Sequence, residues 1–80
     1  MYKIHFVYHS RRGSDVTGKP EEDLNWFATY SIIPRVGDCV SVGCYWFRVD
    51  EVFLYSVEQA KNEVPVLINC SYYQPGKYEG

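Results

Sequence analysis

The chain has 80 residues, enough for one domain with a modest core. Its formal net charge of −2 at pH 7 argues against a dedicated binder of the nucleic-acid backbone, which usually carries a strongly basic face. No apolar run is long enough to cross a bilayer, and Met1 leads straight into a strand pattern without a signal-peptide signature. We therefore expect a single cytoplasmic domain over residues 1–80 that has no membrane partner.

Aromatic residues are unusually frequent at 18%, with eight Tyr, four Phe and two Trp. A core of this size holds about six or seven rings at normal packing density. The surplus rings must therefore line a surface, a groove or a subunit interface.

Alternation of apolar and polar residues predicts a first strand from Tyr2 to His9 and a second from Leu24 to Ile33. Residues 10–23 between them contain one aliphatic residue in fourteen and predict a mobile loop. The second strand carries Trp26 on one face and Phe27 on the other, which suggests that it is covered on both sides.

Pro34 and a Gly37–Asp38 turn interrupt the pattern before a short third strand, residues 39–42. A long fourth strand is predicted for residues 45–55, with a bulge at Asp50–Glu51 where the apolar alternation shifts by one residue.

The polar residues 56–63 that follow can include one helical turn. A fifth strand over residues 64–73 follows, whose Pro65 suggests a sheet edge, and residues 74–80 read as a frayed tail. The predicted fold is all-β, or mostly β with a short helical turn: a five-stranded antiparallel, barrel-like and strongly bent sheet.

The most distinctive stretch is a turn signal with alternating strands on both sides. It runs Pro34-Arg35-Val36-Gly37-Asp38-Cys39-Val40 and continues through Gly43 and Tyr45-x-Phe47-x-Val49-x-x-Val52. Over residues 30–70 the chain resembles small uncharacterised bacterial, phage and mobile-element proteins in which a Pro-x-x-Gly-Asp-x-Val turn starts a hairpin of a Src-homology-type barrel. The resemblance implies structural roles for Gly37 and Asp38 in the turn, implies no catalytic motif, and suggests that the gene belongs to a phage or mobile element.

The thiols Cys39, Cys44 and Cys70 are odd in number and irregular in spacing, so they do not predict a disulfide framework. A zinc site with His5 or His9 would need close ligand pairs, and the chain has no Cys-x-x-Cys motif. No helix start follows a cysteine to activate it as a nucleophile. The carboxylates at 21–23 and 50–51 read as solvated turns. We therefore expect no metal, no cofactor and no enzymatic activity.

The surplus of rings favours an interaction or accessory module that forms a homodimer or higher oligomer, or binds another protein. The candidate interaction residues are Phe27, Tyr45, Trp46 and Arg48. Exposed strand edges at residues 64–67 or in the first strand are candidates for pairing between subunits.

The alternative is a barrel that binds single-stranded nucleic acid or a small ligand, with aromatic stacking and basic contacts. The candidate contacts for nucleic acid are Lys3, Arg11, Arg12, Arg35 and Arg48.

Overall fold

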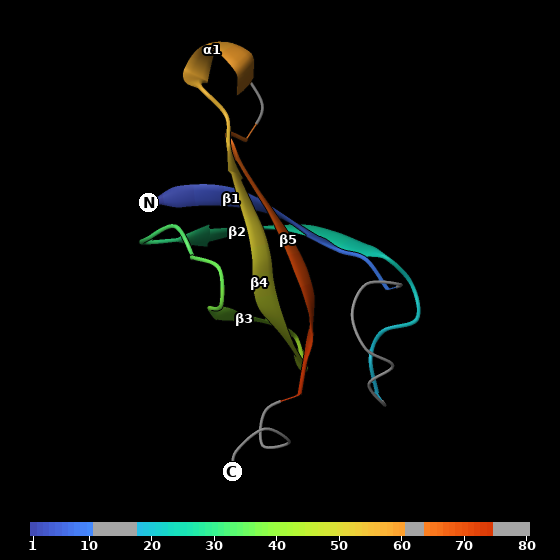
Figure 1. Cartoon of the computed structure of the whole chain (residues 1–80). Coiled ribbons are helices and arrows are strands. Elements are labelled where there is room, and N and C mark those ends of the chain that lie inside the picture. The colour runs from blue at the N-terminus through green and yellow to red at the C-terminus, as the bar shows by residue number, and fades with distance from the viewer. Residues whose placement is uncertain (11–17, 61–63, 75–80) are drawn as a thin grey trace.

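The computed structural model describes residues 1–10, 18–60 and 64–74. Its five strands form one mixed sheet in the order β2-β1-β5-β4-β3, which curls into a half-barrel (Figure 1). The strands are β1 (Tyr2–Tyr8), β2 (Leu24–Tyr30), β3 (Cys39–Val42), β4 (Tyr45–Leu54) and β5 (Val66–Tyr73). The predicted all-β fold with a strongly bent five-stranded sheet is confirmed.

The expected helical turn is α1 (Val57–Ala60), at the tip of the β4–β5 hairpin (Figure 1). Ser56 Oγ accepts a hydrogen bond of 3.2 Å from the Gln59 amide, as an N-cap does. In the part of the chain that the structure describes, no helix has the length and apolarity needed to span a membrane.

One strand pair departs from the antiparallel pattern that the sequence predicts. β1 and β5 run parallel, with His5 opposite Leu67 and Tyr8 opposite Cys70, whereas the other three pairs are antiparallel. Alternation shows which residues share a face but is the same for either strand direction, so the sequence could not reveal this pairing.

The position of β5 also corrects the sequence prediction. It lies in the middle of the sheet, between β1 and β4, so residues 64–67 and the first strand are not the sheet edges. β5 begins at Val66 rather than residue 64, and Pro65, just before it, accepts a hydrogen bond at its carbonyl from the Tyr55 amide at 2.8 Å. The true edge strands are β2 and β3.

β2 is shorter than predicted because it ends at Tyr30, and Ile32 is 66% exposed rather than part of the core. β1 ends one residue early, at Tyr8. Most of the predicted mobile loop and frayed tail, residues 11–17 and 75–80, lies outside the described residues.

The core lies on the inner face of the half-barrel. Its nine buried residues come from β1, β3, β4 and β5: Ile4, Phe6, Tyr8, Val40, Phe47, Val49, Val66, Ile68 and Cys70. Trp26 of β2 reaches across to Phe47 of β4, with ring centroids 5.2 Å apart. Because β2 and β4 are not neighbours in the sheet, this contact shows how strongly the sheet is curled.

Two predicted irregularities are confirmed. The register of β4 against β5 shifts between Val49 and Glu51, and the extra residue returns Val52 to the inner face. In the turn before β3, Gly37 has a φ of 96°, and Asp38 Oδ2 accepts a hydrogen bond from the Arg35 amide at 2.8 Å.

Hydrogen bonds tie the two ends of the first loop to the end of β1. Tyr8 Oη donates to the Pro20 carbonyl at 2.8 Å, and the Ser10 amide donates to Asp23 Oδ1 at 2.8 Å. Lys19 Nζ donates to the Ser10 carbonyl at 2.9 Å. The chain therefore returns to the sheet in a defined position for β2.

Candidate interaction surface

The sheet has a second, outer face on which apolar side chains are left uncovered. Strand registers place the residues between the core positions on this face, because successive side chains of a strand point to opposite sides. Five of the described aromatic side chains are exposed: Tyr2, Phe27, Trp46, Phe53 and Tyr55. The predicted surplus of rings is therefore present on the surface.

Phe27 is the exposed ring with two defined contacts to the neighbouring strand β1. It is 55% exposed, yet the His5 ring stacks on it at a centroid distance of 4.5 Å and an interplanar angle of 17°. Lys3 Nζ lies 5.5 Å from its centroid, within cation–π range. Two neighbours on β1 thus hold the ring in place while leaving most of it open to solvent.

A row of three apolar side chains and one histidine crosses four strands on this face. Phe27 of β2 lies opposite His5 of β1, which lies opposite Leu67 of β5, which lies opposite Phe53 of β4. We call these four residues the outer row. Leu67 is half-buried, and Phe53 is 39% exposed.

The outer row continues onto the end of the β4–β5 hairpin. Phe53, Leu54 and Tyr55 are consecutive and all exposed, Leu54 to 67% and Tyr55 to 45%. Figure 1 shows this end of the hairpin rising past β1 with α1 at its tip. A projecting hairpin with apolar side chains on both of its faces is typical of a contact surface.

The four predicted interaction residues do not form one patch. Trp46 is 43% exposed and lies opposite Tyr73, six residues along β5 from Leu67 and so roughly 20 Å from the outer row. Tyr45, another of the predicted interaction residues, faces the inner side of the sheet, with its ring centroid 6.1 Å from that of Tyr72.

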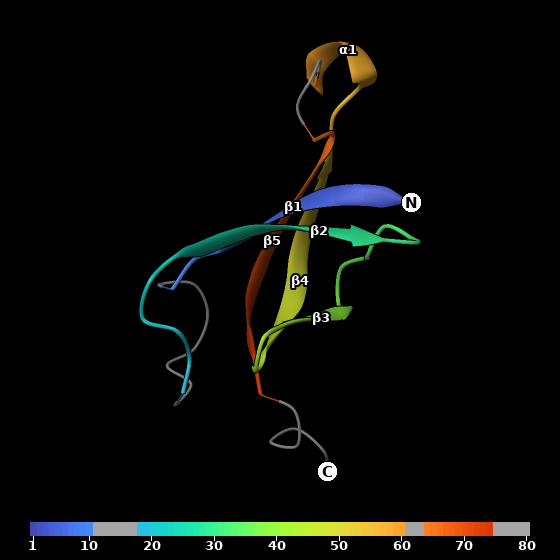
Figure 2. The ribbon, with the colours of Figure 1, turned by 180° about the vertical axis from the view of Figure 1, so that it is seen from behind.

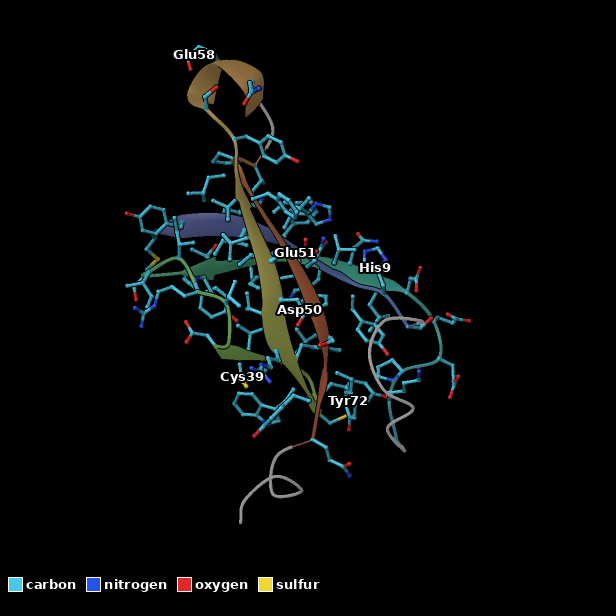
Figure 3. The ribbon with its side chains drawn as sticks, viewed as in Figure 1. His9, Cys39, Asp50, Glu51, Glu58 and Tyr72 are labelled. Carbon is cyan, nitrogen blue, oxygen red and sulfur yellow. The ribbon has the colours of Figure 1, made fainter. Side chains whose placement is uncertain are left out.

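Polar pairs separate the outer row from Trp46. Asn69 Nδ2 donates to Glu51 Oε1 at 3.1 Å, and Ser71 Oγ donates to Asp50 Oδ1 at 3.2 Å. Figure 3 labels Glu51 and Asp50 one above the other along β4. They are half-buried and hydrogen-bonded to β5, and not the freely solvated turn that the sequence suggested.

The basic candidates are also dispersed. Lys3 lies on β1 beside Phe27, Arg35 in the turn before β3, and Arg48 on the outer face of β4 opposite Ser71. Arg11 and Arg12 lie outside the described residues. Between Lys3 and Arg48 lies β5, with Asn69 hydrogen-bonded to the acidic Glu51.

The thiols fall into two classes. Cys39 and Cys44 are exposed and free, whereas Cys70 is buried and donates to the Val7 carbonyl at 3.5 Å. Burial, with a smaller contribution from Asp50, raises the pKa of Cys70 to about 12, so this thiol stays protonated at neutral pH. Among residues 1–10, 18–60 and 64–74, no group of three His, Cys, Asp or Glu side chains could hold a metal ion.

Two buried nitrogens have no hydrogen-bond partner within the described residues: His5 Nε2 and Trp26 Nε1. A buried polar atom without a partner costs about 1–3 kcal/mol. Both atoms lie in the β1–β2 part of the sheet, on opposite faces. Among the described residues, the buried polar side-chain atoms without a hydrogen bond are therefore concentrated there.

The sequence did not reveal three exposed residues at the end of the β4–β5 hairpin: Phe53, Leu54 and Tyr55. The signals available were the bulge, which reverses the face of every residue after it, and the length of the predicted fourth strand. Neither signal shows how far the hairpin extends beyond its neighbours.

No known family model matches this chain, and no curated protein or solved structure is significantly similar to it.

Proposed function

We propose that this protein is a non-enzymatic interaction module that associates with a second copy of itself through the outer face of its sheet, with the exposed ring of Phe27 as the anchor. The observation that carries the proposal is the outer row, in which the Phe27 ring contacts His5 and Lys3 but remains 55% exposed. An aromatic ring held rigidly at a surface loses little conformational freedom on binding, which favours its use as an anchor.

The nine-residue core also supports self-association. A domain of this size buries a smaller share of its surface than a larger domain does, and burying Phe27 against a second copy would add to its stability. Each aromatic side chain removed from water contributes about 1.5–3 kcal/mol.

Sedimentation velocity over a range of chain concentrations tests the proposal. We expect a concentration-dependent dimer, and we expect a Phe27→Ser variant to weaken association at least tenfold. Ile32→Ser is the matched control, because Ile32 is 66% exposed but lies in the loop after β2, away from the outer row. A wild-type chain that remains monomeric at high concentration would refute the proposal.

Titration with a single-stranded oligonucleotide tests the alternative function, which is binding of single-stranded nucleic acid. Trp46 is 43% exposed, so its fluorescence should report a ligand stacked on it. A strong, salt-dependent response from a chain that remains monomeric would assign nucleic-acid binding instead.

A further inference from the structure

β2 is an edge strand without the features that normally protect an edge. Its seven residues, Leu-Asn-Trp-Phe-Ala-Thr-Tyr, include no charge and no proline, and its pairing with β1 is continuous without a bulge. Natural sheets guard exposed edges with charged residues, proline, bulges or very short strands. The opposite edge, β3, has such a safeguard, because it is only four residues long.

The outer edge of β2 carries unused backbone hydrogen-bonding groups. Across the described residues, β1 is the one strand that pairs with β2, and the backbone hydrogen bonds of the turns and loops lie in the turn before β3, between this turn and β4, and in the β4–β5 hairpin, with none to β2. Figure 2, which views the molecule from behind, shows β2 running across it beside β1.

We infer that two copies of this chain pair antiparallel along β2, about a two-fold axis at Phe27, to form one continuous sheet with five strands from each copy. This inference rests on the proposed self-association and specifies its geometry. The two-fold axis stands perpendicular to the sheet, so the inner faces of both half-barrels lie on the same side.

The alternation of side chains restricts where this axis can pass. Directly opposed residues of an antiparallel pair point to the same face, so a strand that pairs with its own copy must have one residue opposite itself. Phe27 is the middle residue of β2, and centring the axis there pairs all seven residues, with about six to eight backbone hydrogen bonds.

The side chains are complementary in this register. On the outer face Phe27 meets its own copy, and the two His5–Phe27 stacks join the two outer rows into one strip. On the inner face Trp26 lies opposite Ala28 of the second copy, a large side chain against a small one. An axis at Trp26 would instead oppose two indoles, and one at Ala28 would oppose Trp26 and Tyr30.

Disulfide trapping tests the register. In a Cys39→Ser/Cys44→Ser background with the buried Cys70 retained, we mix two single variants, Asn25→Cys and Thr29→Cys, under mild oxidation. These positions lie opposite each other in the inferred pair, within the Cα separation of about 4.4–6.8 Å that a disulfide requires. We expect a covalent dimer from the mixture and none from either variant alone, since each position is then about 13 Å from its own copy.

In the same background, Phe27→Cys should form a disulfide with Phe27→Cys of the second copy. Phe53→Cys, on the inner strand β4, is the control and should not cross-link. If the wild-type chain sediments as a dimer but the mixture gives no more cross-linking than each variant alone, pairing through β2 is refuted and self-association stands. If the wild type does not dimerise, the proposed function itself fails.

Discussion

Cys70 illustrates how one residue links packing to pH. It lies on the inner face of the central strand, fully buried, and its thiol donates to the carbonyl of Val7 on the neighbouring strand. From the sequence, all three cysteines are most simply small buried or half-buried hydrophobes. This is correct for Cys70 and wrong for Cys39 and Cys44, which are exposed.

The raised pKa of Cys70 predicts a loss of stability at alkaline pH. The unfolded thiol loses its proton near its ordinary pKa of 9.0, whereas the folded thiol keeps it up to about 12. The unfolded chain therefore binds fewer protons between these values, and the free energy of unfolding falls as the pH rises through this range. Burial also raises the pKa of Tyr8 and Tyr30, which adds to the fall above pH 10.

Urea denaturation at a series of pH values measures this effect. Cys70→Ala should lower stability at neutral pH, because a buried side chain is truncated, but make the alkaline decline shallower. Cys39→Ala, at an exposed thiol, should leave the decline unchanged. Equal pH slopes for the wild type and Cys70→Ala would contradict the assignment.

At the scale of elements, the turn before β3 controls how β3 and β4 enter the sheet. The Gly37 amide donates to the Val49 carbonyl at 2.9 Å, and the Val49 amide donates to the Asp38 carbonyl at 2.8 Å. The turn therefore extends the pairing of the third and fourth strands beyond β3 itself. The roles in the turn predicted for Gly37 and Asp38 from the sequence are confirmed.

Gly37→Ala should destabilise the fold by about 1–2 kcal/mol, because the φ of 96° disfavours a Cβ atom. A Cβ at this position would meet no atom within 4 Å, so the cost comes from the backbone conformation and not from a clash. Gly37→Asn is the matched control and should cost less, since asparagine tolerates positive φ better. Unchanged chemical-denaturation midpoints for Gly37→Ala would refute this reading.

At the scale of the whole molecule, the described part of the half-barrel leaves two edges and much of one face uncovered. The inner face is filled by rings from four strands, β1, β2, β4 and β5, among them the pair Tyr8 and Phe47 at 5.1 Å and the pair Phe6 and Trp26 at 5.3 Å. The apolar side chains of the outer face therefore stay exposed, and we propose that Phe27, on the edge strand β2, contacts a second copy.

If the folded state is a dimer, its melting temperature depends on concentration. Because dimerisation stabilises by mass action, a tenfold rise in chain concentration should raise Tm by about 3–5 °C for a chain of this size. The Phe27→Ser variant should show a smaller dependence of Tm on concentration. A wild-type Tm that is also independent of concentration would argue for a monomer.

The sequence by itself determined the number of strands, their approximate limits, the bulge at Asp50–Glu51 and the Gly37–Asp38 turn. These features follow from local physics: side chains alternate with a period of two, and glycine accepts a positive φ. The same alternation puts Trp46 on the face opposite Phe47 and Val49, and in the structure Trp46 is 43% exposed while Phe47 and Val49 are buried.

Only the tertiary structure decided which strands are neighbours. It placed β5 at the centre, made β1 parallel to it and aligned Phe27 with Phe53 across four strands. The physical reason is that strand pairing joins residues far apart in the chain and depends on which inner faces bury the most apolar surface together. The pattern within a single strand contains no information about its partner or its direction.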